Sequence, residues 1–136
     1  LIPRLARDLV RIKLELAPPR LETGPLHTRR DYVDVRDAAR AFVLAMGHRG
    51  SLPERINVAS GRTWSGRQIL KAMTHSLSID PELKEKAGSG GIVTVRGDAS
   101  LAAGTLGWKA AIPMSATLRD VLREWLRRLR PSGGDR

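Results

Sequence analysis

The sequence predicts an α/β fold in which helices surround a few short strands. Apolar residues recur every three or four positions in several segments, and this is the period of an amphipathic helix. Short runs rich in valine, isoleucine and tyrosine lie between these segments and are typical of β-strands. With 136 residues, 41% of them hydrophobic, the chain has enough apolar surface for one modest core.

The first part of the chain predicts a helix, a strand and a second helix. The first helix ends before Pro18, because proline disfavours helical backbone in the residue that precedes it. Its apolar face consists of Leu5, Leu9, Ile12 and Leu16. Residues 32–35 (YVDV) alternate apolar and polar side chains, as a short strand does. The second helix should pack on the core through Ala38, Ala39, Phe42, Val43 and Met46.

A second strand and helix follow. Residues 55–59 (RINVA) predict a short strand, and Ser65 is a suitable N-cap for a third helix because its hydroxyl can accept a backbone N–H of the first turn. The inner face of that helix consists of Ile69, Leu70, Met73 and Leu77. The strand and helix pattern therefore occurs twice within residues 1–79.

The remainder of the chain is divided by a polar stretch. Residues 80–91 (DPELKEKAGSGG) show no periodicity, so we expect a flexible loop there. Residues 92–130 predict a strand, a short helix and a long last helix, with Trp108 and Trp125 buried, and residues 131–136 predict a disordered tail. The last helix carries a stripe formed by Met114, Leu118, Val121, Leu122, Trp125, Leu126 and Leu129.

The net charge of +10 points to an anionic partner or a phosphate-bearing ligand. Only 4% of the residues are aromatic and no basic tract is interleaved with Tyr or Phe, so we do not expect nucleic acid as the partner. A non-catalytic basic α/β module that binds nucleic acid or an acidic protein remains the alternative hypothesis.

Several classes of site lack the residues they need. The chain has no cysteine, and His27, His48 and His75 have no spacing that suggests a shared metal ion. No apolar run is long enough to cross a membrane, and we expect a cytoplasmic location. No glycine-rich dinucleotide fingerprint, phosphate loop or nucleophile paired with a base is present, so we name no catalytic residue.

Three blocks in the chain carry a resemblance to a known family. They are RRDYVDVRDAARAFVLAM at 29–46, INVASGRTWSGRQIL at 56–70 and RGDASLAAGTLGWKAAIPMSATLRDVLREW at 96–125. In this order they resemble the C-terminal part of the extended short-chain dehydrogenase/reductases. The resemblance is to the NAD-dependent epimerase/dehydratase group, and within it to GDP-mannose 4,6-dehydratases and GDP-6-deoxy-4-keto-mannose reductases.

The resemblance implies the substrate-binding portion of such an enzyme, without its Rossmann cofactor domain. The family's glycine-rich loop and Tyr-x-x-x-Lys pair have no counterpart here, since the single tyrosine, Tyr32, is not followed by a lysine at that spacing. NAD or NADP would serve the full-length parent, and this chain alone would bind neither and would be inactive. The implied partners are a nucleotide-diphosphate sugar, the missing N-terminal Rossmann half and, in the parent, a second copy in a homodimer.

The resemblance assigns Arg30 as the first-choice substrate ligand. The arginine before the aspartate of this block contacts the diphosphate in relatives, and a guanidinium matches phosphate oxygens in two places. Arg29 should point to the opposite face of the strand, towards solvent or a structural ion pair. A salt bridge from Arg30 to Asp34 or Asp37 is the alternative, and both aspartates are otherwise expected to be structural.

Arg4 and Arg96 complete the expected substrate-binding residues. Arg4 matches the family position at which a side chain from a helix start meets the nucleotide, and Arg7 could substitute for it. Relatives carry an Arg-Pro-x-Asp/Glu stretch where this chain has residues 88–91 (GSGG), so Arg96, or else Lys84 or Lys86, would supply the missing charge. Because a partner domain covers relatives on one side, we also expect an exposed apolar patch that includes part of the helix at 1–16.

Overall fold

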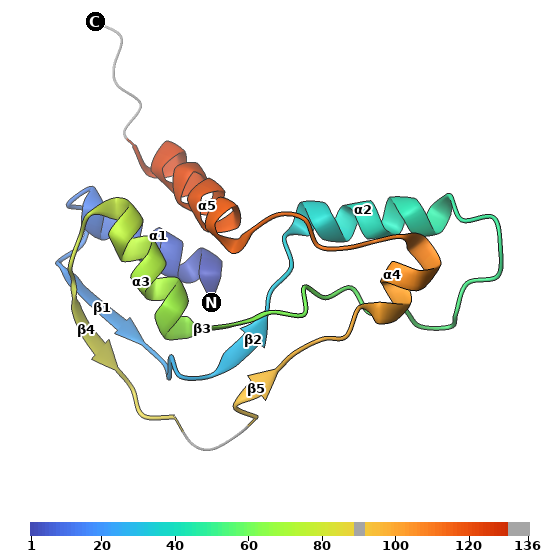
Figure 1. Ribbon diagram of the computed structural model, residues 1–136. Helices are drawn as coiled ribbons and strands as arrows, with labels where there is room; N and C mark the ends of the chain where they lie inside the picture. The colour runs from blue at the N-terminus through green and yellow to red at the C-terminus, as the bar shows by residue number, and fades with distance from the viewer. Residues whose placement is uncertain (89–91, 131–136) are drawn as a thin grey trace, which may run out of the picture. The chain divides into compact units, whose positions relative to one another are not determined.

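The computed structural model describes residues 1–88 and 92–130, and Figure 1 shows their helices and strands. The chain forms two compact units. Unit 1 comprises Leu1–His27, Gly66–Ser89 and Ser115–Arg136, and unit 2 comprises Thr28–Ser65 and Gly90–Met114. The expected tail at 131–136 and the last part of the expected loop, 89–91, lie outside the described residues.

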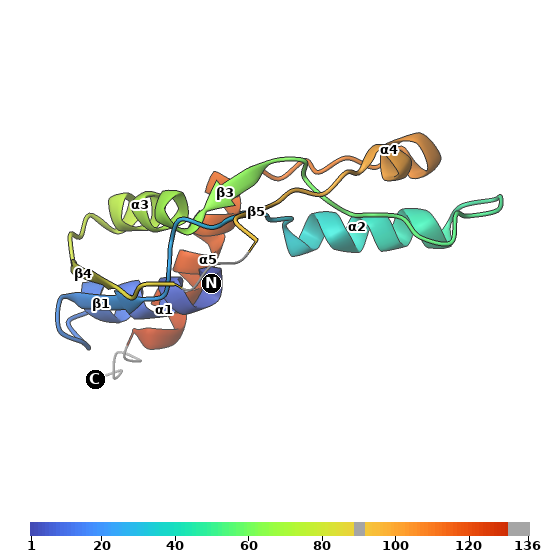
Figure 2. The same cartoon turned by 90° about the horizontal axis from the view of Figure 1, so that it is seen from below.

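Unit 1 is built on two helices that pack side by side. Helices α1 (Ile2–Lys13) and α3 (Gly66–Leu77) lie next to each other in Figures 1 and 2. The predicted inner face of α3 is confirmed, because all four of its apolar residues are buried: Ile69, Leu70, Met73 and Leu77. In α1 the buried residues are Ile2, Leu5, Ala6, Leu9 and Val10.

A two-stranded parallel sheet completes the first part of unit 1. Strand β1 (Arg20–Thr23) pairs with β4 (Glu82–Glu85), so four residues of the expected loop at 80–91 are a strand. The polar sequence of β4 hides this strand, because ion pairs with its neighbours replace apolar packing. Arg20 contacts Glu82 at 3.3 Å between Nη2 and Oε1. Glu85 accepts the backbone N–H of Leu26 at 2.8 Å, and this bond lowers the pKa of its carboxyl.

The last helix, α5 (Met114–Leu129), lies in unit 1 from residue 115 onward. Of its predicted apolar stripe only Leu118 and Leu122 are buried. Trp125 is half-buried and has the Arg128 guanidinium 5.6 Å from its ring centroid. The expected burial of Trp125 is therefore only partial.

Unit 2 contains helices α2 (Val35–Met46) and α4 (Ser100–Leu106), which lie alongside each other in both views. Its three-stranded sheet has the order β3-β2-β5, with β2 (Arg29–Asp31) antiparallel to β3 (Thr63–Ser65) and parallel to β5 (Thr94–Val95). The predicted burial of Trp108 is confirmed at 1% exposure. It packs with Ala41 and Ala102, and with the partly buried residues Val33, Ile56, Val58, Ala99, Leu106 and Ala110.

Neither strand predicted in the first 60 residues has its expected position: one is shifted and the other is not formed. The strand expected at 32–35 lies three residues earlier, because the Asp34 side chain accepts the N–H of Arg36 and starts α2 at Val35. Residues 55–59 belong to no strand in the described part of the chain. Ile56 and Val58 still pack on Trp108 and its neighbours, so their apolar character is used without a strand ladder.

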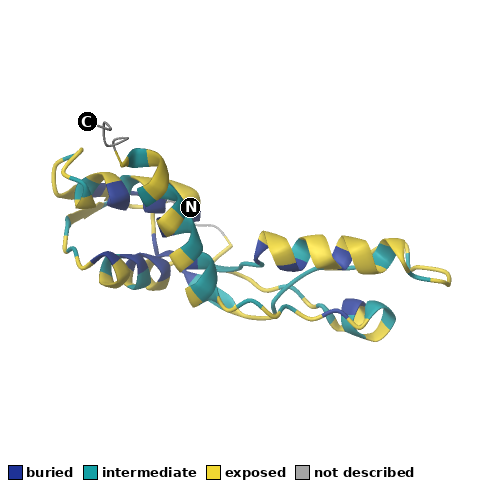
Figure 3. Cartoon of the chain, turned by 90° about the horizontal axis from the view of Figure 1, so that it is seen from above, coloured by how far each residue is buried: buried dark blue, intermediate teal, exposed yellow. Residues whose placement is uncertain are grey.

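The predicted core face of α2 is also wrong. Phe42 is 70% exposed and Met46 is 82% exposed, and Figure 3 shows most of the helix in the colour of exposed residues. The residues of α2 that are buried are Asp37 and Ala41. The helix expected to reach Leu16 ends at Lys13, and the large hydrophobic residues exposed in this segment are Leu1 and Leu16, which lie outside α1, because the apolar face of α1 packs inside unit 1. The larger exposed apolar surface lies on α2.

Candidate functional site

Strand β2 presents its central arginine and its two flanking residues on opposite faces. Side chains alternate along a strand, so Arg29 and Asp31 share one face and Arg30 lies on the other. The register pairs Arg30 with Trp64 of β3 and with Val95 of β5. Residues directly opposite in a ladder share a face, so Trp64, Arg30 and Val95 form one row across the sheet.

Asp31 organises the loops at the other face of this sheet. Its carboxylate accepts the N–H of Ser60 at 2.9 Å, the hydroxyl of Ser60 at 2.6 Å, the N–H of Gly61 at 2.8 Å and the N–H of Gly97 at 3.2 Å. A Cβ at Gly97 would lie 2.3 Å from the Cβ of Ala59, so only glycine allows this close approach. Sequence reasoning missed Asp31, although its position directly after two arginines was the available signal.

Arg29 is held against the neighbouring strand. Its Nε donates to the Thr63 hydroxyl at 3.0 Å and its Nη2 donates to the Thr63 carbonyl at 2.9 Å. These bonds lie on the Asp31 face of the sheet and tie β2 to β3. Arg29 was expected to meet solvent or a structural ion pair, and on this face it also makes hydrogen bonds to Thr63.

Arg30 is half-buried, and one nitrogen of its guanidinium donates hydrogen bonds to backbone carbonyls. Its Nη1 donates to the carbonyls of Arg29 at 2.8 Å and Val93 at 3.3 Å. Within residues 1–88 and 92–130, its Nε and Nη2 have no recorded hydrogen-bond partner. The planar edge that carries two parallel N–H groups is thus open to a ligand with two acceptor oxygens.

The two aspartates considered as partners of Arg30 are engaged elsewhere. Asp34 caps α2 and contacts the Arg36 guanidinium at 2.8 Å. Asp37 is fully buried, contacts Arg40 at 2.8 Å and accepts the N–H groups of Ala111 and Ile112. These contacts fit the structural purpose expected for both aspartates.

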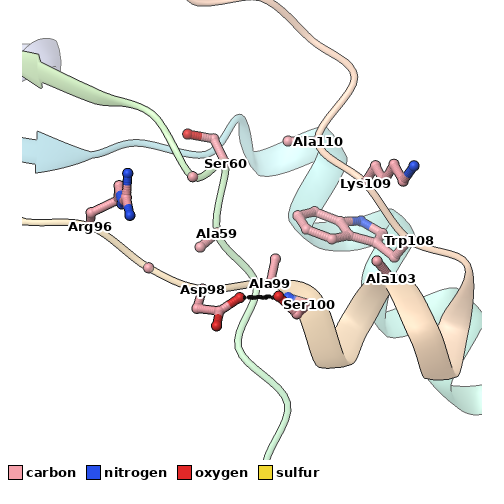
Figure 4. Close-up of a pocket in the computed structure, with 12 residues that line it drawn as sticks. Ala59, Ser60, Arg96, Asp98, Ala99, Ser100, Ala103, Trp108, Lys109 and Ala110 are labelled. Atoms are coloured by element: carbon pink, nitrogen blue, oxygen red, sulfur yellow. Dashed lines mark hydrogen bonds between the residues drawn. The ribbon is translucent and has the colours of Figure 1, made fainter.

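Arg96 lines a cavity of about 600 Å³ within unit 2, shown in Figure 4. The side chain is exposed and lies one residue beyond Val95, the ladder partner of Arg30. Lys109 lies at the other end of the cavity, and the Asp98 carboxylate accepts the Ser100 hydroxyl between them. That bond lowers the pKa of the Asp98 carboxyl. Arg30 is not among the described residues that line this cavity.

Arg4 belongs to unit 1 and lines a second cavity, of about 380 Å³, together with Arg7, Arg11 and Arg20. Its Nη2 donates to the Glu22 carbonyl at 3.0 Å, and its Nε lies 3.7 Å from Asp8. The lysines considered as substitutes for Arg96 contact Glu22 in the same unit, Lys84 at 3.6 Å and Lys86 at 3.9 Å. Their charges are thus partly neutralised by Glu22.

Neither a metal cluster nor a membrane-spanning helix is found in the described ranges. No group of three or more His, Cys, Asp or Glu side chains in residues 1–88 and 92–130 could hold a metal ion. No helix within the same residues is both long enough and apolar enough to cross a membrane.

Comparison with known proteins supports the resemblance carried by the three sequence blocks. The model of the NAD dependent epimerase/dehydratase family matches residues 1–59. GDP-6-deoxy-D-mannose reductase from Pseudomonas aeruginosa is 29% identical over 132 residues, which are 95% of this chain and 43% of the reductase. The chain is similar to the NAD dependent epimerase/dehydratase family over the matched residues. It spans less than half the length of this curated relative.

Solved structures related to the family share the fold. RMD from Pseudomonas aeruginosa, complexed with NADPH, superposes with a TM-score of 0.89 at 28% identity. The match covers 94% of this chain and 43% of the RMD chain. UDP-glucose-4-epimerase from Stenotrophomonas maltophila, with bound NAD and formylated UDP-arabinopyranose, gives a TM-score of 0.72 at 26% identity, covering 92% of this chain and 40% of its own. The predicted fold class is confirmed: the chain is an α/β structure with helices around a few short strands, and this arrangement is shared with part of the reductase structure.

Proposed function

We propose that this chain is the nucleotide-sugar-binding portion of an NAD(P)-dependent sugar-nucleotide epimerase, dehydratase or reductase. The observation that carries the proposal is the open edge of the Arg30 guanidinium on β2. The relatives named above are a GDP-6-deoxy-D-mannose reductase and a UDP-glucose-4-epimerase with a bound UDP-sugar derivative, and these names support a nucleotide-diphosphate sugar as the ligand class.

The setting of Arg30 suits a diphosphate. Two backbone carbonyls hold Nη1, so the plane of the guanidinium is oriented before a ligand arrives. The Nε–Nη2 edge then offers two parallel donors to two phosphate oxygens, and charge-assisted bonds of this kind are among the strongest in proteins. Because little side-chain freedom is left to lose, ordering Arg30 costs little on binding.

Arg96 and Arg4 are proposed as further contacts to the anionic ligand. Arg96 is exposed beside a polar cavity in the same unit as Arg30. Arg4 has three other arginines around its own cavity in unit 1, and these side chains create a positive potential there. Each would attract phosphate over several ångströms, with Arg30 making the directed contact.

The proposal assigns hydride transfer to another part of the parent protein. Tyr32 is half-buried, and burial raises the pKa of its phenol, so it is a poor general base at neutral pH. NAD or NADP would bind to a Rossmann half that carries the catalytic tyrosine and lysine. This chain would hold the nucleotide so that the hexose reaches the nicotinamide, and such positioning can lower the barrier substantially.

The exposed face of α2 supports the expectation of a further half. Val35, Phe42, Val43 and Met46 recur at helical spacing and are all more than half exposed, at 77%, 70%, 63% and 82%. Residues 55–59 pack beside α2 without a ladder partner in the described residues. We propose that a Rossmann half of the parent covers this helix face, and that the parent assembles as a homodimer.

Calorimetric titration of the 136-residue chain with GDP-mannose tests the proposal. Removing a charge-assisted contact costs about 1.5–3 kcal/mol, so Arg30→Ala should weaken binding by roughly ten- to a hundredfold. Arg30→Lys should recover only part of the loss, because an ammonium lacks the planar fork. Arg127→Ala on α5 is the matched control and should change the affinity by less than about threefold.

Two outcomes would contradict this function. Equal and small losses for Arg29→Ala, Arg30→Ala and Arg127→Ala, all abolished by high salt, would favour the alternative of a basic module that binds anions without a specific site. Measurable NADPH-dependent turnover of a nucleotide sugar by this chain would contradict the assignment of catalysis to another half.

A further inference from the structure

We propose that Trp64 is the stacking platform for the nucleobase of the ligand whose diphosphate Arg30 binds. The inference rests on the proposed nucleotide-sugar function and goes beyond it by assigning a base-binding residue. Trp64 lies on β3, the edge strand of the unit 2 sheet, directly opposite Arg30.

The register places the two side chains on one face. Opposing residues of an antiparallel ladder have Cβ atoms about 5 Å apart and point to the same side of the sheet. Trp64 and Arg30 are both half-buried, and Val95 on the far side of Arg30 is 45% exposed. An aromatic ring, a guanidinium and an aliphatic side chain therefore follow one another across three strands.

Trp64 differs from the two other tryptophans of the chain. The Trp108 indole N–H donates to the Asp37 carbonyl at 2.8 Å inside the core of unit 2. Trp125 has the Arg128 guanidinium near its ring. Trp64 has neither kind of recorded contact in the described ranges, so both its ring and its indole N–H are available to a ligand. Half-buried tryptophans with an open donor suit ligands that are planar and carry acceptors.

The geometry matches the order of groups in a nucleoside diphosphate. A ribose separates the base from the first phosphate, and Trp64 and Arg30 likewise occupy two neighbouring positions on adjacent strands. The bonds from Arg29 to Thr63 fix β3 against β2 from the opposite face, so the pair is held before binding. Stacking on an aromatic ring is favourable for any base, and the two-ring indole overlaps best with a purine.

Binding of three probes to the full 136-residue chain tests this assignment. GDP contains base and diphosphate, inorganic pyrophosphate lacks the base, and mannose 1-phosphate offers a hexose in its place. Trp64→Leu should weaken GDP binding about tenfold and leave pyrophosphate binding unchanged. The GDP affinity of Trp64→Phe should stay within about threefold of that of the unsubstituted chain. Arg30→Ala should weaken both GDP and pyrophosphate, and Trp125→Leu is the matched control.

Tryptophan fluorescence tests whether the base contacts Trp64. In a Trp125→Phe background, where the other remaining tryptophan is the buried Trp108, GDP should quench the fluorescence of Trp64. Pyrophosphate should not, because only a stacked base approaches the indole. Circular dichroism of each variant verifies that the fold is retained. The Trp64→Phe variant keeps a ring in the sheet, so it separates loss of stacking from loss of folding.

Each other outcome overturns a defined part of the assignment. An unchanged GDP affinity in Trp64→Leu, with a loss in Arg30→Ala, removes the stacking inference and keeps the proposed function. Equal losses for GDP and pyrophosphate in Trp64→Leu mean that the ring only supports Arg30, which also overturns stacking. A loss for mannose 1-phosphate alone would assign the ring to the hexose. No effect of Arg30→Ala on any probe would overturn the proposed function itself.

Discussion

Helices α1 and α2 have the same length and similar apolar patterns, but they differ in how much of the apolar face is buried. Both are 12 residues long. In α1 five apolar residues are buried, because α3 packs alongside it. In α2 the buried residues are Ala41 and Asp37, while Phe42 and Met46 are exposed. Helical periodicity thus identifies a face that is suited to burial, and burial itself requires a partner surface.

The side of α2 that is buried is held by polar contacts as much as by apolar ones. Asp37 accepts two backbone N–H groups from the segment before α5, and its carbonyl accepts the Trp108 indole N–H. Its helical neighbour Ala41 is small enough to let α4 approach. A helix with a broad exposed apolar face and a narrow polar anchor is organised for a contact on each side.

The largest expected effect comes from the well-packed helix. Leu9 is fully buried in unit 1, so Leu9→Ala should lower the free energy of unfolding by about 3 kcal/mol through lost contacts and a cavity. Chemical denaturation followed by circular dichroism measures the change. Leu9→Met nearly conserves volume and should cost less than about 1.5 kcal/mol. A loss below 1 kcal/mol for Leu9→Ala would show that α1 is not a core helix.

A smaller loss is expected for the polar anchor of α2. Asp37→Ala leaves the N–H groups of Ala111 and Ile112 without an acceptor, and we expect a cost of about 2 kcal/mol. Arg40 is partly exposed, so the loss of its ion pair adds little. Asp37→Asn keeps one acceptor oxygen and should cost less than Asp37→Ala in the same denaturation experiment. Equal costs would mean that the charge, and not the accepted hydrogen bonds, matters.

The exposed face of α2 should hardly contribute to the stability of this chain. Phe42→Ala removes a 70% exposed ring and should change the free energy of unfolding by less than about 0.5 kcal/mol. The same change should reduce self-association in sedimentation velocity, because exposed apolar surface promotes it. A destabilisation as large as that of Leu9→Ala would show that α2 already has a partner within this chain.

The smallest effect concerns the surface of α5 and its pH dependence. Hydrogen bonds from Arg127 and Arg128 lower the pKa of Glu124 from 4.5 to about 2. Because the folded pKa lies below the unfolded one, this stabilisation is complete above pH 4.5 and is lost as the pH falls towards 2. The midpoints of thermal unfolding of the unsubstituted chain and of Glu124→Gln should differ slightly at pH 6 and converge near pH 2. A difference that persists at pH 2 would exclude this ion pair as the cause.

Some features of the fold could be predicted because they depend on local sequence. The helical spacing of Ile69 and Met73 correctly predicted α3 and its inner face. The alternation of side chains along an extended segment correctly predicted that Arg29 and Arg30 lie on opposite faces of a strand. The strands were predicted less well. β3 and β5 are only three and two residues long, and such short elements exist because a neighbouring strand supplies their hydrogen bonds.

The sequence by itself determined the amphipathic helices, the excess of positive charge and the three blocks that resemble the family. Periodicity, composition and residue order are local properties that need no knowledge of what lies nearby. The tertiary structure alone decided that Arg30 keeps an open edge, that Asp31 ties two loops to β2, and that Trp64 stands beside Arg30. These facts depend on which strands pair and in which register, and contacts between residues 29 and 66 positions apart in the sequence help to set that register.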